Sequence, residues 1–455
     1  MRELTNIENI KKIYFLGIGG IGMSAIARYF NSKGIIVAGY DKTPTALTSQ
    51  LEQEGIFVHF NDDVSEFPQD TDIVVYTPAI PATNAILTWC RNNDVQLLKR
   101  SDMLQIISKD TYNICIAGTH GKTTTSSMVA HVLRDSGYGC NAFLGGIASN
   151  YETNFWSYPN DVAVIEADEY DRSFLKLFPN IISISAMDPD HLDIYHTASE
   201  MEDAFVQFTS NLKKDGLLLS KKGIQREASL NGDTHYSYHL NDTTADIYTS
   251  SLEINNGGYL YNVNGPNWSI ENISLKMGGM HNVENSLVAI AIAKHLGIAD
   301  DLIKKAISNF LGVKRRFEYV LNVDEHVFID DYAHHPEELK VLINGARAMF
   351  PLHKCTVIFQ PHLFTRTRDL VDGFAEILQL ADEVILLPIY PARELPIPGV
   401  TSEWLASKMH DKVSVMSKED VLAYIKKNKP AMLITAGAGD IDKMVEPIKN
   451  CLLAS

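Results

Sequence analysis

The sequence contains little that would place the protein outside the cell. The N-terminal residues form no apolar signal segment, and no run approaches the roughly 18 apolar residues of a membrane span. Cysteine is rare, and its few copies are scattered without the paired spacing of a metal site. We therefore expect a cytoplasmic protein with reduced thiols and no membrane partner. The 455 residues include five cysteines, which are Cys90, Cys115, Cys140, Cys355 and Cys451.

The sequence also lacks an excess of positive charge. Its 56 acidic residues outnumber its 40 basic ones, which gives a formal net charge of −16. Surfaces that bind nucleic acid in general are basic, so we expect no nucleic-acid partner. An acidic protein can still have locally positive clefts, so the charge does not exclude small anionic substrates.

No repeat or low-complexity segment interrupts the chain, which is too long for a single core. Alternating strand and helix signals predict α/β domains, with clear strands at Ile13–Leu16 and Thr356–Phe359. Residues 245–275 differ, because alternating β sequence surrounds a hairpin signal at 255–258. A single helix is expected near residues 368–380. We predict three domains, with boundaries at 1–107, 108–313 and 314–455.

The stretch 113–125 carries the strongest functional signal. A buried strand, Ile114–Ala117, leads through glycines into Lys122-Thr123 and an amphipathic helix. In such a loop, backbone N–H groups bind phosphates, the lysine reaches the terminal ones and the threonine hydroxyl holds Mg²⁺. An ordinary strand-to-helix turn is the alternative, but the pattern favours a chain that uses ATP. The ATP loop consists of Gly118, Thr119, His120, Gly121, Lys122, Thr123 and Thr124.

A second glycine loop, Gly17-x-Gly19-x-x-Gly22, follows the first strand and opens a helix. With Asp41 about twenty residues later, it matches the dinucleotide-binding fingerprint. Glycines and a helix N-terminus accept any pyrophosphate, however, including that of a UDP-sugar. A nicotinamide cofactor and a purely structural turn are alternatives, but the extra Gly20 and the ATP loop make a dehydrogenase less favoured.

Acidic residues follow two strands of the second block. Glu166 ends the strand Val162–Ile165, and the strand Ile181–Ile184 leads to Asp188-Pro-Asp190-His191-Leu-Asp193. Parallel strands end at one edge of a sheet, where the ATP loop also lies. Carboxylates there suit Mg²⁺, although solvated loop acids and a structural histidine are the plain alternatives.

Two further patterns have both a structural and a functional interpretation. Asn282 and Asn285 lie one helical turn apart, where amides either read an adenine edge or cap the helix. The basic run 314–316 stands at a domain junction. It is either a solvated face or a group that closes onto polyphosphate.

These motifs closely resemble those of the Mur ligases, and the resemblance covers essentially the whole chain. It implies a three-domain α/β architecture, with an N-terminal Rossmann-like UDP-binding domain, a central P-loop ATPase domain and a C-terminal Rossmann-like domain. The first glycine loop would then hold UDP and not a nicotinamide. The motifs are Gly17–Ser24, Gly118–Thr124, Glu166–Glu169, Asp190–Asp193, His281–Asn285, Arg315–Phe317, Asp331–Pro336 and Thr365–Arg368.

The resemblance implies an ATP-dependent ligase of peptidoglycan precursor synthesis that forms an acyl phosphate. Its first motif favours the members that join L-alanine to the lactyl carboxylate of UDP-N-acetylmuramate. ATP, these two substrates, Mg²⁺ or Mn²⁺ and at most a weak homodimer are the implied partners. The alternatives are a later amino-acid-adding or tripeptide-recycling member, an NAD-dependent oxidoreductase, or a nucleotide-binding regulatory module without turnover.

Residue roles also follow from the resemblance. The implied metal ligands are Thr123, Glu166 and His191, and the implied ATP contacts beyond the loop are Asn282, Asn285, Arg316 and Asp331. The implied UDP-sugar contacts are Gly17, Gly19, Gly20, Gly22, Met23, Ser24 and Asp41. The implied catalytic residues are Lys122, Glu166, His191, Arg316, His335 and Arg366, of which His335 and Arg366 belong to the amino-acid end. Many alanine-adding members differ from this chain at Tyr170, Arg172 and Leu363.

Overall fold

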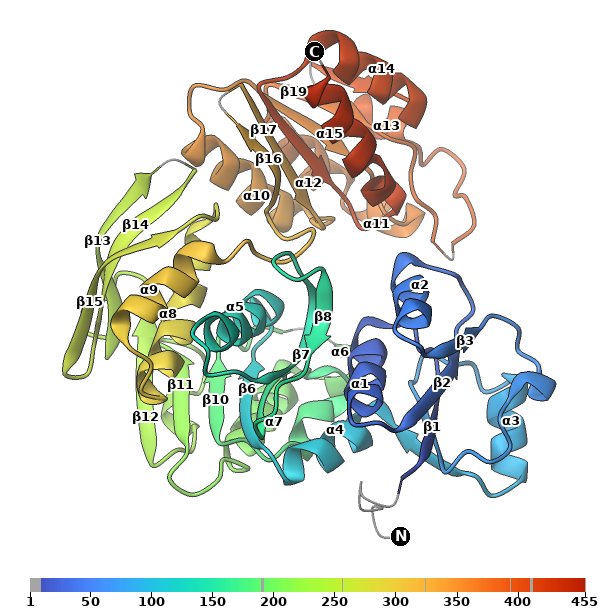
Figure 1. Cartoon of the computed structure of the whole chain (residues 1–455). Coiled ribbons are helices and arrows are strands. Elements are labelled where there is room, and N and C mark those ends of the chain that lie inside the picture. Colours follow the sequence, from blue (N-terminus) through green and yellow to red (C-terminus); the bar gives the residue numbers. More distant parts are fainter. Residues whose placement is uncertain are drawn as a thin grey trace. The chain divides into compact units, whose positions relative to one another are not determined.

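The computed structural model describes residues 10–189, 192–255, 257–323, 325–392, 394–409 and 412–454, without the side chains of residues 192 and 193. The chain contains three α/β regions, each built on its own sheet (Figure 1). By packing, it divides into two compact units. The first unit is Met1–Ser250, Val263–Ile270 and Glu284–Ile307, and the second is Ser251–Asn262, Glu271–Val283 and Ser308–Ser455. The domain boundaries expected from the sequence stay predictions.

The first sheet is parallel, with strand order β3-β2-β1-β4-β5. Alternate residues of β1 are buried on opposite faces, Phe15 beneath α1 and α4 and Tyr14 beneath α3. Burial on both faces is what a doubly wound sheet requires, so the predicted fold of this region is confirmed. The elements are β1 Lys12–Leu16, α1 Ile21–Ser32, β2 Ile36–Tyr40, α2 Ala46–Gln53, β3 Phe57–His59, η2 Val64–Glu66, β4 Ile73–Tyr76, α3 Ala85–Asn92, β5 Gln96–Lys99 and α4 Arg100–Lys109.

The second sheet has the order β15-β14-β13-β12-β11-β10-β6-β9-β7-β8. The strand before the ATP loop, β6, lies between β9 and β10 and is parallel to both. The ends of these strands therefore share one sheet edge, as the sequence predicted. β13 and β14 are neighbours on either side of the predicted hairpin turn. The strands are β6 Tyr112–Ala117, β7 Asn141–Ala148, β8 Thr153–Trp156, β9 Val162–Glu166, β10 Ile181–Ile184, β11 Leu217–Lys221, β12 Thr234–His239, β13 Ile247–Asn255, β14 Gly258–Gly265 and β15 Trp268–Leu275. The helices are α5 Lys122–Asp135, η3 Tyr170–Lys176, α6 Leu192–Tyr195, α7 Ala198–Thr209, η4 Glu227–Ser229, α8 Met280–His295 and α9 Asp300–Asn309.

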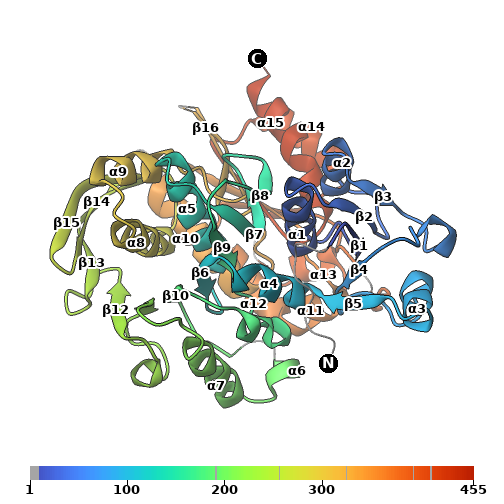
Figure 2. The same cartoon turned by 60° about the horizontal axis from the view of Figure 1, so that its bottom comes forward.

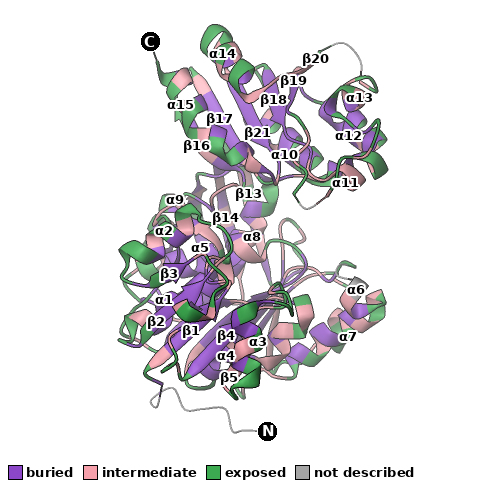
Figure 3. Ribbon diagram, turned by 90° about the vertical axis from the view of Figure 1, so that its right-hand side faces the viewer, coloured by how far each residue is buried: buried purple, intermediate pink, exposed green. Residues whose placement is uncertain are grey.

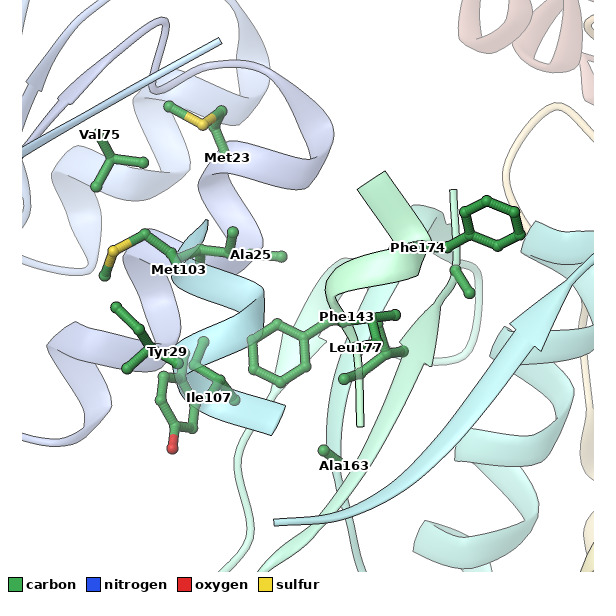
Figure 4. Packing of buried hydrophobic residues seen from close by; sticks show 14 of the residues in the cluster. Met23, Ala25, Tyr29, Val75, Met103, Ile107, Phe143, Ala163, Phe174 and Leu177 are labelled. Carbon is green, nitrogen blue, oxygen red and sulfur yellow. The ribbon is translucent and has the colours of Figure 1, made fainter. Parts of the chain in front are cut away.

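Within the first unit, α1 and α4 lie on the face of the first sheet that is turned toward β7 and β8 (Figures 1 and 2). Tyr29 of α1 packs against Phe143 of β7, with ring centroids 5.3 Å apart (Figure 4). Both rings belong to one continuous apolar core that also includes Met103 and Ile107 of α4. This shared core ties the two sheets of the first unit together.

The third sheet has the order β16-β17-β21-β18-β19-β20, with only β16 antiparallel to its neighbour. Figure 3 shows its strands mostly buried and its outer helices more exposed. The elements are β16 Glu318–Val323, β17 His326–Asp331, α10 Pro336–Met349, β18 Cys355–Phe359, α11 Phe364–Asp369, α12 Val371–Leu378, β19 Glu383–Leu386, α13 Ser402–Ala406, β20 Val413–Val415, α14 Lys418–Asn428, β21 Met432–Ala436, η5 Asp440–Met444 and α15 Val445–Leu453.

The helix expected near 368–380 is present as α12, and the shorter helix α11, which the sequence analysis did not predict, precedes it directly. They meet at Leu370, whose φ of −117° and ψ of 16° are not helical. The break lets α12 approach α10 closely, since a Cβ on Gly373 would lie 3.2 Å from Cγ of Pro336. The sequence period alone does not show this change of direction.

All five cysteines are free, which confirms the expectation of unpaired thiols. Four are buried, and burial raises the pKa of Cys90 to about 11 and those of Cys140 and Cys355 to about 12. Cys451 on α15 is only half-buried. Among the described residues, no helix is both long enough and apolar enough to cross a membrane.

Candidate active site

The ATP loop joins β6 to α5 and is fixed by its glycines. Gly118 has a φ of +123° and Gly121 a φ of +77°, which favour glycine over residues with a Cβ. A Cβ on Gly118 would also lie 2.2 Å from Oγ of Ser185, in the segment after β10. The loop is thus pressed against the neighbouring strand end, with the N-terminus of α5 directly behind it.

Lys122 is the first residue of α5, and its ammonium is held at two points. Its Nζ donates to the carbonyl of Gly118 and to Oε1 of Glu169, each at 2.7 Å. Glu169 is 1% exposed, and Lys122 is 15% exposed. Because both partners are largely withdrawn from water, the cation is held in place beside the loop's N–H groups.

Glu166, at the end of β9, lies beside Thr123. Thr123 Oγ1 donates to Glu166 Oε1 at 2.9 Å, while Ser126 Oγ and the Gly145 N–H donate to Oε2 at 3.3 and 2.9 Å. Burial raises the pKa of Glu166 despite these hydrogen bonds. Gly145 is required here, because a Cβ on it would lie 2.3 Å from Glu166 Oε1.

Two of the three expected metal ligands therefore meet at hydrogen-bond distance. A carboxylate and a hydroxyl are oxygen donors that suit Mg²⁺, so these residues fit the ion. The third expected ligand, His191, lies outside the described residues, as does Asp190. Within the described ranges, no group of three or more His, Cys, Asp or Glu side chains is placed to hold a metal.

The remaining loop residues differ in their surroundings. Thr119 Oγ1 accepts a hydrogen bond from the Asp188 N–H at 3.1 Å, so it ties the loop to the segment after β10. His120 is 71% exposed and lies 3.4 Å from Asp188. Thr124 is buried in the first turn of α5. Thr119 and Thr124 therefore shape the loop, whereas His120 faces solvent.

Helix α8 brings an amide to the same loop. A Cβ on Gly121 would lie 3.0 Å from Oδ1 of Asn285, which places this side chain against the ATP loop. Asn282, in the second compact unit, is buried, and its Nδ2 donates to the Gly278 carbonyl at 2.8 Å. Asn282 thus ties the start of α8 to the preceding turn through a donated hydrogen bond, which differs from the cap of the structural interpretation, where the side chain accepts.

The first glycine loop is held by the end of β2. The N–H groups of Gly17 and Ile18 both donate to the Tyr40 carbonyl, and Gly19 N–H donates to Asp41 Oδ2 at 2.8 Å. A Cβ on Gly19 would lie 2.8 Å from that same oxygen. Asp41 therefore fixes the path of the loop.

Two residues of this motif, Met23 and Ser24, face the packed interior, whereas Gly20 is exposed and closes the turn of the loop. The Gly20 N–H donates to the Gly17 carbonyl, Met23 lies in the core at 2% exposure, and Ser24 Oγ accepts from Asn154 Nδ2 at 2.9 Å. These contacts hold the loop and the start of α1 in place.

In the second compact unit, Asp331 organises the turn that carries Arg316. Its carboxylate accepts from the Phe317 N–H at 2.6 Å and from the Ala333 N–H at 2.7 Å. Burial raises the pKa of Asp331 to about 6. Arg315 and Phe317 have φ values of +60° and +48°, which are costly for residues with a side chain. Asp331 thus stabilises a strained turn around Arg316.

The expected amino-acid residues are only partly brought together. His335 is the N-cap of α10, where its ring accepts from the Glu337 N–H at 3.4 Å. Nη1 of Arg366 instead lies 3.4 Å from Nδ1 of His362. The ring of His362 stacks on that of Tyr390, with ring centroids 5.8 Å apart. The ring of His334 is 6.1 Å from that of His362.

From the sequence, no role was assigned to His334 or His362, although one signal concerned His334. A residue directly before a proline is biased toward extended backbone, and Pro336 opens a helix. His335 was therefore the natural cap of that helix, which leaves His334 as the histidine of this pair that lies beside His362.

Three family profiles match the chain in succession. They are described as the Mur ligase family, catalytic domain (residues 12–112), the Mur ligase middle domain (116–293) and the Mur ligase, glutamate ligase domain (315–439). UDP-N-acetylmuramate–L-alanine ligases of Flavobacterium johnsoniae and Parabacteroides distasonis are 44% and 45% identical to this chain. Both matches cover 98% of this chain, and they cover 99% and 98% of the relatives.

A solved structure is similar over almost the whole length. The crystal structure of a UDP-N-acetylmuramate–alanine ligase from Thermotoga maritima matches with a TM-score of 0.84 at 28% identity, over 96% of this chain and 98% of that one. A murein peptide ligase from Psychrobacter arcticus, at 21% identity and a TM-score of 0.67 over 97% and 98%, shares the fold.

Proposed function

The chain belongs to the Mur ligase family, and on this basis we propose that it joins L-alanine to the lactyl carboxylate of UDP-N-acetylmuramate with ATP. One observation of the structure carries the proposal. The ATP loop lies within hydrogen-bond distance of the strand-end carboxylate, with Thr123 Oγ1 2.9 Å from Glu166. In this proposal, phosphate-binding and metal-binding groups share one sheet edge, as transfer of a phosphoryl group to a carboxylate requires.

The reaction proceeds in two steps. A carboxylate oxygen of the sugar attacks the γ-phosphorus of ATP, so that ADP leaves and an acyl phosphate forms. The neutral amine of L-alanine then attacks the carbonyl carbon, phosphate leaves, and the nitrogen loses a proton to give the amide. The main obstacle is the repulsion between the carboxylate and the triphosphate. Catalysis therefore depends on fixed cations and in-line positioning.

Lys122 supplies the fixed cation of the ATP loop, and Glu169 orients it. We assign Mg²⁺ or Mn²⁺ to Thr123, Glu166 and His191, where the ion would neutralise charge between ATP and the sugar carboxylate. Arg316 contributes a further cation to the phosphates, while Asp331 holds its turn and contacts the nucleotide. Each of these assignments is part of the proposal.

The substrates are distributed over three regions in this proposal. Residues 1–107 hold UDP-N-acetylmuramate through the first glycine loop, and 108–313 hold ATP, with Asn282 and Asn285 as adenine contacts. Residues 314–455 supply His335 and Arg366 for the amino acid. We place the reaction in the cytoplasm, with at most a weak homodimer and no membrane partner.

The decisive experiment measures ADP release with UDP-N-acetylmuramate and each of the twenty amino acids, over a range of Mg²⁺ and Mn²⁺ concentrations. We expect release that depends on L-alanine. Release that depends on another amino acid or on a tripeptide would assign the chain to a different Mur-type reaction. A fluorescence titration with NADH tests the oxidoreductase alternative, and saturable binding would contradict the proposal.

A further inference from the structure

A cavity of about 180 Å³ lies in the first compact unit, at the start of α1 and α4 and beside β7 and β9. Its charged lining residues are Arg100, Glu166 and Asp168, and Ser173 adds a hydroxyl. Glu166 already belongs to the proposed metal site, whereas Arg100 and Asp168 have no role in the proposed reaction. Much of the remaining lining is apolar and includes Ile21, Ala25, Leu104, Phe143, Ile165 and Phe174.

The guanidinium of Arg100 is placed by two contacts. Arg100 Nη2 donates to Asp168 Oδ2 at 2.7 Å. On the other side, a Cβ on Gly22 would lie 2.6 Å from Arg100 Nη1, so the guanidinium rests directly on the first turn of α1. This turn follows the first glycine loop. Arg100 therefore lies between the proposed UDP-sugar loop and the strand end that carries Glu166.

Two neighbouring ion pairs hold the same backbone segments together. Lys99 Nζ is 3.3 Å from Asp171 Oδ2, and Lys176 Nζ is 2.5 Å from Asp102 Oδ1. They connect the start of α4 to the segment after β9, as the Arg100–Asp168 pair does. Of these three cations, Arg100 is the one that lines the cavity. Its position therefore needs an explanation beyond joining the two segments.

The charge at this point suits an anion. The N-terminus of α1 carries partial positive charge, to which Arg100 adds a full charge. A guanidinium has five N–H donors in a planar fork, and the bond to Asp168 engages Nη2. Arg100 can therefore hold an anion while Asp168 keeps it oriented. The apolar lining around it accommodates a small group such as a methyl or an acetyl.

We propose that Arg100 binds an anionic group of the UDP-sugar, either its diphosphate or its lactyl carboxylate, and that Asp168 positions the guanidinium. The proposal rests on the proposed function, because it names a contact for that substrate. It assigns Arg100 to the binding of the sugar at the point where its carboxylate must approach Glu166. Asp168 touches Arg100 and is a positioning residue.

The test compares Arg100→Ala and Arg100→Lys with Lys176→Ala, by calorimetry of UDP-N-acetylmuramate binding. Lys176→Ala is the matched control, because it removes an ion pair between the same segments outside the cavity lining. We expect Arg100→Ala to weaken binding by at least about tenfold, as the loss of a charged hydrogen bond implies. Lysine keeps the charge but loses the fork, so Arg100→Lys should recover only part of the affinity.

Two further measurements separate the sources of the anion and exclude a structural effect. UDP-N-acetylglucosamine lacks the lactyl carboxylate, so an unchanged affinity of Arg100→Ala for it would assign the contact to that carboxylate, and an equal loss to the diphosphate. Asp168→Asn should raise KM for the sugar less than Arg100→Ala does, with the KM for ATP unchanged. If Arg100→Ala does not fold, Arg100→Lys and Asp168→Asn decide the question by the same assays.

The proposal is overturned if the Arg100 variants bind the sugar as Lys176→Ala does. A failure of the proposed function would look different. In that case the wild-type protein itself would release no ADP with UDP-N-acetylmuramate and L-alanine, whatever the behaviour of the variants.

Discussion

Two glycine loops in the first compact unit share one plan but differ in charge. Each follows a buried parallel strand and opens a helix, β1 to α1 in one case and β6 to α5 in the other. The ATP loop, here the central loop, contains its own cation, Lys122, and Thr123 of this loop contacts the carboxylate of Glu166. The first glycine loop, here the N-terminal loop, contains no lysine or arginine. Asp41 accepts a hydrogen bond from one of its backbone N–H groups.

The comparison shows that glycine spacing sets the path of the backbone, while the neighbours set the chemistry. A loop with a built-in lysine and a facing carboxylate can neutralise a reacting phosphate. A loop held by an aspartate, with Arg100 supplied from another helix, is suited to holding an anion without reacting with it. Only the second type resembled a nicotinamide site in the sequence.

The largest expected effect is a loss of turnover when the lysine of the ATP loop is replaced. Lys122→Ala should lower turnover by about a thousandfold or more, because the triphosphate loses its nearest fixed cation. The measurement is ADP release with saturating substrates, with folding checked by circular dichroism. Lys222→Ala is the control, since Lys222 lies directly after β11 of the second sheet and pairs with Asp242. Near-normal turnover of folded Lys122→Ala would remove the chemical distinction between the loops.

Replacing one glycine of each loop with alanine should lower the free energy of unfolding by different amounts. Gly118→Ala meets both a φ of +123° and Ser185 Oγ at 2.2 Å, so we expect a cost of about 2–4 kcal/mol. Gly19→Ala meets only the side chains of Asp41 and Thr48, and about 1–2 kcal/mol is expected. Urea denaturation of both variants measures the difference, with Gly34→Ala as the reference for a positive φ in open space. A larger cost at Gly19 would contradict the order.

Asp41→Ala tests the N-terminal loop alone. Asp41 accepts from the N–H groups of Gly19 and Thr43. Its removal should loosen the loop and weaken UDP-N-acetylmuramate binding about tenfold, or about 1.4 kcal/mol. Calorimetry gives the affinity, and a melting curve shows whether stability falls as well. Lower stability with unchanged affinity would mean that Asp41 only caps a turn, and ATP binding should be unaffected in either case.

The smallest expected effect is a pH-dependent gain in the stability of Glu166→Gln relative to wild type. Burial raises the pKa of Glu166 above its ordinary 4.5, so above this pH the folded chain binds protons more tightly than the unfolded one. Stability from this group is therefore lost as pH rises. Glu166→Gln removes that loss, so its melting temperature relative to wild type should be higher at pH 8 than at pH 5.

The exposed Glu253 supplies the control for this measurement, as Glu253→Gln on β13 should show no such difference between the two pH values. If Glu166→Gln melts below wild type by the same amount at both pH values, burial does not raise the pKa of Glu166 and the prediction is wrong.

Local patterns predicted much of the fold. The apolar run Ile114–Ala117 forms β6, and the shared edge of β6, β9 and β10 followed from their parallel direction, whereas the order of these strands did not follow from the sequence. The break at Leu370 did not follow, because it depends on how α12 packs on α10. Sequence periodicity contains no information about such a distant partner.

The site was predicted in a similar way. The proximity of Thr123 and Glu166 follows from simple topology, because the ATP loop and the end of β9 lie at one sheet edge, while the roles of these residues stay predictions. Arg100 was missed because its partner Asp168 lies 68 residues away and belongs to another sheet region. Its sequence surroundings contain no glycine loop or acidic cluster, and only the fold shows that it meets the start of α1.

The distribution of the cysteines has a practical consequence for spectroscopy. Maleimide dyes react with exposed thiolates, and the four buried cysteines have both poor access and, for Cys90, Cys140 and Cys355, a raised pKa. The half-buried thiol of Cys451 on α15 should therefore label first in the native chain. A second cysteine introduced at an exposed position of the first compact unit, such as Lys33, would give a donor–acceptor pair. Fluorescence energy transfer could then follow how the separation of the two units responds to ATP, without removal of any natural cysteine.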